Sequence, residues 1–117
     1  MESVAIGEAD ASYASALERT IEGEPGLSVA GRADTVASLL VLVVERDPGV
    51  VLVDVGLPGG TAGLVSRARE LGVTSRFVGM ATMVTPRVRR AASTAGLEVL
   101  VAKGDGANLL EAITAAD

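Results

Sequence analysis

The feature that most constrains this chain is an uninterrupted apolar run, Val50–Val53, that ends at Asp54 and is followed by the turn residues of the segment 56–59. Four consecutive apolar residues bounded in this way are typical of a strand that is buried on both faces of a parallel sheet. In open α/β sheets, sites form at the carboxyl ends of the strands. Asp54 is therefore predicted to present its carboxylate in a functional site.

Four other short apolar runs alternate with segments of helical spacing. With the strand that ends at Asp54, we predict strands at 4–6, 27–30, 76–80 and 97–102, and a turn at 31–34 after the second of the five strands. We predict helices at 11–22, 35–46, 62–71, 86–95 and 107–115. This alternation indicates right-handed crossovers and a doubly wound, five-stranded parallel α/β sheet with five helices. The elements account for residues 1–117 as a single domain.

Composition excludes several classes of function. The chain has 117 residues, with one Phe, one Tyr and no Trp, whereas base-stacking surfaces need aromatic side chains. Its net charge of -5 has the wrong sign for attraction to a phosphate backbone. We therefore expect no binding of nucleic acid by this domain alone.

Cysteine and histidine are both absent, which excludes a disulfide framework and the usual zinc sites but leaves room for a cation with oxygen ligands. No apolar run reaches the length that spans a membrane, and the start Met1-Glu2-Ser3 does not resemble a basic signal peptide. The sequence therefore predicts a cytoplasmic protein without membrane contact.

Charged residues fall at the predicted strand ends that would meet at one edge of the sheet. In a flavodoxin-like strand order, 2-1-3-4-5, the carboxyl ends of strands one, three, four and five converge. The residues at these ends are Glu8, Asp10, Asp54, Ala81, Thr82 and Lys103. A carboxylate that attacks a phosphoryl group needs a divalent cation and a lysine ammonium to offset its charge. We therefore predict Asp54 as a phosphoryl acceptor supported by Lys103. The predicted ligands of this cation are Glu8, Asp10, Asp54 and the backbone carbonyl of Gly56.

With these residues, the chain resembles the receiver domains of two-component response regulators over essentially its whole length. Asp54 with the loop 56–59 looks like the phosphoacceptor loop of that family, and the segment 100–103 looks like the strand that ends in its lysine. The segment 24–31 is most similar to receivers that precede a LuxR-type helix-turn-helix domain. The resemblance implies a CheY-like fold, phosphorylation by a sensor histidine kinase, Mg²⁺ and a role in transcription regulation. It also implies a carboxy-terminal DNA-binding domain, which is not in this chain.

Four positions depart from the family pattern. The family usually places two adjacent acids after the first strand, whereas the second position here is Ala9. Ala81 stands where the family has a switch hydroxyl, and the next residue, Thr82, either substitutes for that hydroxyl or obstructs the site. Leu100 replaces the expected aromatic residue. We therefore expect a weakened metal site and an altered readout.

The same residues also have structural interpretations. Asp54 could cap the loop that follows it, and Lys103 could neutralise a buried acid without any phosphorylation. Glu8 and Asp10 could be acids at a helix start, where they favour the helix dipole. Both interpretations stay open at this point.

Two surfaces are candidates for contact with a partner. The segment 38–44 is apolar almost all round, although a helix packed on a sheet needs only one apolar stripe. It is either a wide buried face or a docking surface, and in the second case we expect Val41 or Leu42 in a protein interface. Arg87, Arg89 and Arg90 form either a solvated face or part of the signalling surface that the resemblance implies, made by helix four, strand five and helix five. We expect a homodimer through one of these surfaces.

Three functions compete. The first is a switch in which a kinase phosphohistidine donates to Asp54 with Mg²⁺ and the fourth helix and fifth strand change arrangement. The second is a degenerate pseudo-receiver that acts by dimerisation or by binding a ligand or partner; Ala9 and Ala81 favour it, whereas Asp54 and Lys103 favour the first. A flavin-binding or hydrolytic enzyme lacks support, because the chain has no aromatic to flank a flavin, no Gly-rich phosphate loop and no His. We expect a regulatory domain that is not a turnover enzyme.

Overall fold

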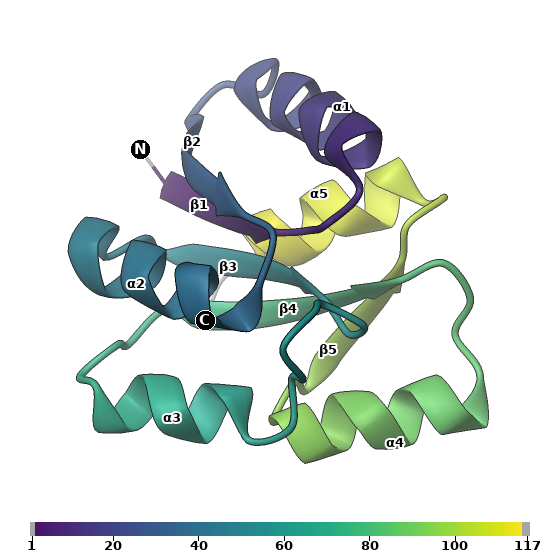
Figure 1. The fold of residues 1–117 in the computed structure, drawn as a ribbon. Coiled ribbons are helices and arrows are strands. Elements are labelled where there is room, and N and C mark those ends of the chain that lie inside the picture. The colour runs from purple at the N-terminus through teal and green to yellow at the C-terminus, as the bar shows by residue number, and fades with distance from the viewer. Residues whose placement is uncertain (1, 116–117) are drawn as a thin grey trace.

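The computed structural model describes residues 2–115 as a five-stranded parallel sheet with helices on both faces (Figure 1). The strands are β1 (Glu2–Gly7), β2 (Leu27–Ala33), β3 (Val50–Asp54), β4 (Arg76–Ala81) and β5 (Val99–Ala102). The helices are α1 (Ala11–Glu22), α2 (Val36–Arg46), α3 (Leu64–Glu70), α4 (Pro86–Ala95) and α5 (Gly106–Thr114). The strand order β2-β1-β3-β4-β5 confirms the predicted doubly wound fold. The outer ends of the predicted domain, 1 and 116–117, lie outside the described residues.

Strand β3 explains why its apolar run is uninterrupted. Side chains of a strand alternate between the two faces of a sheet. Val50 and Leu52 pack in the core beneath α1 and α5, whereas Val51 and Val53 pack in the core beneath α2, α3 and α4 (Figure 1). All four residues are fully buried. The central strand is therefore fixed on both faces, and Asp54 at its end is held on a rigid element.

Strand β2 is longer than predicted. The sequence predicted a strand that ends at Ala30 and a turn that starts at Gly31, but β2 continues to Ala33. The register between β1 and β2 shifts between the pairs Val4–Val29 and Ala5–Gly31, so that Ala30, next to Gly31, is an extra residue on β2 and forms a β-bulge. Gly31 has a φ of 153°, and a Cβ there would lie 2.9 Å from Cδ1 of Leu42. The predicted turn was wrong because Gly31 lies next to a β-bulge, where its backbone approaches Leu42 of α2 closely.

Strand β5 begins at Val99 and not at Leu97 as predicted. The backbone N–H of Leu97 donates to the carbonyl of Ala92 and closes the end of α4. Gly96 makes this closure possible with a φ of 87°, in the left-handed region that favours glycine. Helix α3 begins at Leu64, two residues later than predicted, because the preceding residues form a turn.

Side chains cap several of the helices at their starts. Asp10 caps α1, Thr35 and Ser38 form a capping box at α2, and Asp105 caps α5. These caps fix the loops at the carboxyl edge of the sheet. Within residues 2–115, no helix has the length and apolar character needed to cross a membrane.

Candidate functional site

Three charged residues meet at the carboxyl edge of the sheet. Glu8 follows β1, Asp54 ends β3 and Lys103 follows β5. The Nζ of Lys103 lies 2.9 Å from Oδ2 of Asp54 and 2.5 Å from Oε1 of Glu8. The structure thus brings together three of the site residues predicted from sequence, although Asp54 and Lys103 are 49 residues apart in the chain.

The remaining oxygens of the two carboxylates accept hydrogen bonds from the backbone. Oδ1 of Asp54 accepts from the N–H of Gly56 at 2.9 Å, and Oε2 of Glu8 accepts from the N–H of Asp10 at 3.2 Å. Each of the four carboxylate oxygens therefore contacts a nitrogen. The side chain of Glu8 is almost fully buried, at 2% exposed, whereas that of Asp54 is 22% exposed. Asp54 is thus the acid that a molecule in solution can reach.

Lys103 is held from several directions. Its backbone N–H donates to the carbonyl of Ala81 at 2.8 Å. The hydroxyl of Tyr13 donates to the carbonyl of Lys103 at 3.3 Å, and the Nζ lies 5.0 Å from the centre of the Tyr13 ring, within the range of a cation–π contact. The sequence placed Tyr13 only within the predicted helix 11–22. Its position in the first turn of the helix that follows β1 indicates a residue near this edge of the sheet, but it does not predict the contact with Lys103.

The charges around Lys103 decide its protonation. Burial by itself lowers the pKa of Lys103, but hydrogen bonds to Glu8 and Asp54 and attraction to their charges outweigh this effect, so that the pKa is raised above 10.5. The pKa of Tyr13 is raised above 10.0, mainly by burial and further by the two acids, while Lys103 opposes the increase. At neutral pH, the site therefore holds an ammonium ion beside a neutral phenol.

Two other predicted residues take different positions. Oδ1 of Asp10 accepts from the N–H of Tyr13 at 3.1 Å, and this exposed carboxylate caps α1. Thr82 is exposed in the loop after β4. The contact that Gly56 makes with Asp54 comes from its N–H. The structure therefore does not gather Asp10 and Thr82 around Lys103.

A cavity of about 590 Å³ opens beside Asp54. Most of its lining is apolar, and the charged residues in it are Asp54 and Arg87. Thr82 and Ala81 also line it. Asp54 is thus accessible from the side of the β4–α4 loop, where a small donor or a partner side chain would approach.

No family model and no curated protein matches the sequence. Solved structures do match. A LuxR-family two-component response regulator from Aurantimonas sp. SI85-9A1 has a TM-score of 0.86 at 24% identity and covers 98% of this chain and 84% of its own. The signal receiver domain of NarL from Mycobacterium tuberculosis has a TM-score of 0.83 at 20% identity, with 98% of both chains covered. The non-phosphorylated receiver domain of RcsB from Escherichia coli has a TM-score of 0.84 at 17% identity, with 97% and 91% covered.

This chain has the receiver-domain fold. The match covers nearly the whole chain and includes the five-stranded order and the five helices. At these identities the likeness establishes the fold, and the chemistry of the site has to be argued from its own residues.

The resemblance of the sequence to receivers implies Mg²⁺, but the donors of this receiver fold do not fit a Mg²⁺ centre in the arrangement described. Among residues 2–115, no group of three acidic side chains is placed to hold a metal ion. Ala9 offers no side-chain oxygen, and the carboxylate of Asp10 is used in the helix cap. Lys103 occupies one oxygen of each remaining acid. Mg²⁺ requires several oxygen ligands in a nearly octahedral arrangement, and this set is too small.

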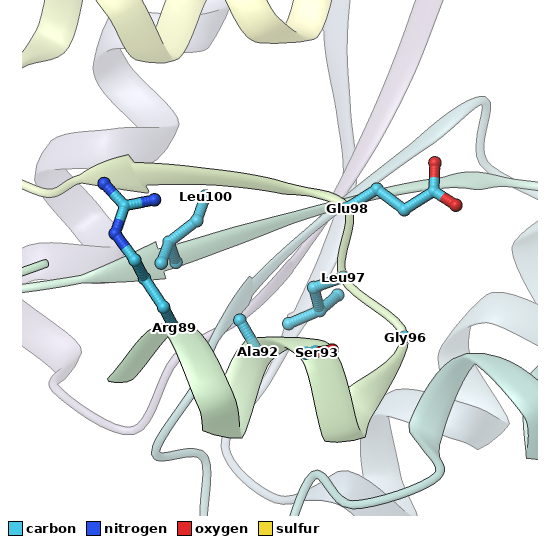
Figure 2. A pocket seen from close by; sticks show the side chains of 7 residues that line it. All are labelled: Arg89, Ala92, Ser93, Gly96, Leu97, Glu98 and Leu100. Carbon is cyan, nitrogen blue, oxygen red and sulfur yellow. The ribbon is translucent and has the colours of Figure 1, made fainter. Parts of the chain in front are cut away.

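A second pocket of the receiver fold lies between α4 and β5 (Figure 2). It measures about 500 Å³, and Figure 2 shows that its two charged side chains, Arg89 and Glu98, point away from each other. Leu97 and Leu100 form its apolar wall on the β5 side. Leu100 is the residue that replaces the aromatic expected from the family pattern. The residues that line this pocket include no lysine, unlike the site where Asp54 meets Lys103.

Proposed function

We propose that this chain is the receiver domain of a two-component response regulator and that Asp54 accepts a phosphoryl group. The observation that carries the proposal is a partly exposed carboxylate at the end of the central strand, open to a cavity and 2.9 Å from a lysine ammonium. The signal would be passed to an attached or partner output that controls transcription. The proposed phosphoryl donor is a sensor histidine kinase, and the proposed location of this domain is the cytoplasm. The resemblance supports the donor and the transcriptional output.

The proposed step is a single transfer. A carboxylate oxygen of Asp54 forms a bond to phosphorus, the bond from phosphorus to the phosphohistidine nitrogen breaks, and the imidazole keeps that electron pair. The Nζ of Lys103 offsets the charge near the acceptor, and the N–H of Gly56 fixes the carboxylate. Water later hydrolyses the acyl phosphate. The domain is thus modified once per signal and does not turn over a substrate.

The test is the intact mass of the chain after incubation with acetyl phosphate, with and without MgCl₂. We expect wild type to gain one phosphoryl group and Asp54→Asn to gain none. Asp47→Asn is the matched control, because Asp47 ends α2 and has a φ of 46°, which asparagine tolerates. A phosphoryl group that persists in Asp54→Asn would refute the acceptor, and an unmodified wild type would refute the reaction.

A second function, the pseudo-receiver without phosphorylation, has one specific observation in its favour. Lys103 is shared between Asp54 and Glu8, and its contact with Glu8 is the shorter of the two. An ammonium held in this way could serve a purely structural role. An unmodified wild-type chain in the same mass measurement would support this function.

We also propose that the domain forms a homodimer, through α2 or through the surface of α4, β5 and α5. On α2, Val41 is 56% exposed and Val44 is 49% exposed, whereas Leu42 packs partly against the core. Of the two residues that the sequence suggests for an interface, Val41 faces solvent and Leu42 packs against the core. Val41 is therefore the better candidate for a contact with a partner. Arg87, Arg89 and Arg90 are exposed on α4, as a solvated or docking face requires.

A further inference from the structure

We infer that the ammonium of Lys103 is the resident cation of this site and that it keeps a divalent metal ion away from Glu8 and Asp54. The inference concerns the charge balance of the proposed phosphoacceptor and rests on that function only for its phosphorylation arm. It starts from the disagreement between the Mg²⁺ that receivers imply and the donors present in this chain.

The geometry is that of one cation between two anions. The Nζ of Lys103 contacts one oxygen of each carboxylate, at 2.5 Å for Glu8 and 2.9 Å for Asp54. An ammonium is a compact point charge with three rotatable donors, so it can serve two carboxylates at once. Lys103 is also the only lysine in the sequence, since the other nine basic residues are arginines. The chain thus places its one compact cation at this position.

A divalent ion would have to displace interactions that the site already makes. The second oxygen of Glu8 accepts from the N–H of Asp10, and that of Asp54 accepts from the N–H of Gly56. Ala9 supplies no replacement ligand. An entering Mg²⁺ would therefore compete for three oxygens that accept hydrogen bonds and for Oε1 of Glu8, which has the Lys103 ammonium as its ion-pair partner, with no third acid to compensate.

Displacing Lys103 is also unfavourable. Its side chain is only 15% exposed and lies over the ring of Tyr13, while that of Glu8 is 2% exposed. If the ammonium left, the buried Glu8 carboxylate would lose its counter-charge, which is costly in a low-dielectric environment. The metal and the lysine are therefore alternatives, and the structure favours the lysine.

The experiment uses Tyr13 as a reporter. It is the only tyrosine, the chain has no tryptophan, and its ring contacts the Nζ of Lys103. Tyrosine emission and Tm are measured during a titration with MgCl₂ in the millimolar range. For wild type we expect no saturable change. Saturable binding by wild type that disappears in Asp54→Asn would overturn the inference.

Two variants make the result informative. Lys103→Met frees both carboxylates and is expected to bind Mg²⁺ about tenfold or more tightly than wild type, with a rise in Tm on addition of the metal. Ala9→Asp changes an exposed residue and adds a third acid while Lys103 stays in place, so it is expected to bind Mg²⁺ more weakly than Lys103→Met does. If Lys103→Met folds and binds Mg²⁺ no more tightly than wild type, or if Ala9→Asp alone binds Mg²⁺ as tightly as Lys103→Met is expected to, Lys103 is not what excludes the metal and the inference fails.

The phosphorylation arm separates this inference from the proposed function. Wild type is incubated with acetyl phosphate in EDTA and in MgCl₂, and its intact mass is compared. Equal phosphorylation in both buffers supports both proposals. Phosphorylation only with MgCl₂ supports the function and overturns the resident cation. If wild type is phosphorylated in neither buffer, and MgCl₂ changes neither the tyrosine emission nor the Tm, the proposed function is wrong and the inference about Lys103 is supported.

Discussion

The ends of β1 and β3 lie side by side in the sheet and both carry acidic residues, but they use them differently. At β3, Asp54 is partly exposed and faces a cavity. After β1, the side chain of Glu8 is buried and forms an ion pair with Lys103, and Asp10 caps the next helix. A carboxylate is thus accessible from solution at one strand end, whereas the carboxylates at the other are buried and paired with Lys103 or used in a helix cap. Burial and the nearest donor decide which role a carboxylate takes.

This difference explains how the proposed acceptor can be retained without the metal site that the resemblance implies. The proposed acceptor side needs only Asp54, the N–H of Gly56 and Lys103, and Asp54 contacts both of the others. The β1 side needs adjacent acids that both face the acceptor, and Ala9 interrupts them. Lys103 connects the two sides, so changes there should have the largest effects.

The largest expected effect on stability comes from Lys103→Met. Removing one partner of a buried ion pair leaves an uncompensated charge, and we expect a loss of about 3 kcal/mol in the free energy of unfolding. Urea denaturation measures it. The control is the double variant with Glu8→Gln, which removes the stranded charge and should recover part of the loss. A single variant as stable as wild type would mean that Glu8 does not depend on Lys103.

The next largest effect on stability tests whether Asp10 acts as the cap of α1 or as part of the site at Asp54. Asp10→Ala should lower the free energy of unfolding by about 1 kcal/mol, the usual loss for an N-cap, while Asp10→Asn should be close to neutral because asparagine also caps well. Phosphorylation by acetyl phosphate should be the same in both variants. If both variants lost phosphorylation, Asp10 would belong to the site and the contrast between the two strand ends would be wrong.

A smaller effect is expected in alkaline solution. The pKa values of Lys103 and Tyr13 are raised in the folded protein above 10.5 and 10.0, so the folded state holds these protons more tightly than the unfolded state. Their contribution to stability is complete below about pH 10 and is lost as the pH rises through the folded values. Unfolding measured from pH 8 to about pH 11.5 should show this decline. Tyr13→Phe should reduce the slope, and an unchanged slope would exclude Tyr13 from the coupling.

The smallest effect on stability is expected on α2. Val41→Asp should change the free energy of unfolding by less than about 0.5 kcal/mol, because this side chain is exposed. It should nevertheless lower the mass in solution from dimer to monomer. Leu71→Asp is the matched control, since Leu71 is also 56% exposed, at the end of α3. A mass that Val41→Asp leaves unchanged would exclude this face as the dimer contact.

Much of the fold was predictable because the residues that specify it act locally. The apolar run of β3, the Pro86 start of α4 and the Asp47-Pro48 end of α2 have one physical interpretation each. Gly31 has two physical interpretations, because a glycine is equally suited to a turn and to a β-bulge. Only the register of β1 against β2 and the contact with Leu42 select the bulge.

The site was predictable in part for the same reason. Parallel strands bring their carboxyl ends together, so the meeting of Glu8, Asp54 and Lys103 followed from the strand order. The sequence left Asp10 either as a metal ligand or as a helix-start acid, and the hydrogen bond to the N–H of Tyr13 selects the cap. The contact of Tyr13 with Lys103 depends on side-chain packing between α1 and the end of β5, which no spacing rule describes.

The most direct test of this account is the mass of the peptide that contains Asp54 after wild-type protein has been incubated with acetyl phosphate. The account predicts one phosphoryl group on that peptide, absent in Asp54→Asn and retained in Asp47→Asn. A wild-type peptide that stays unmodified in both MgCl₂ and EDTA would contradict it.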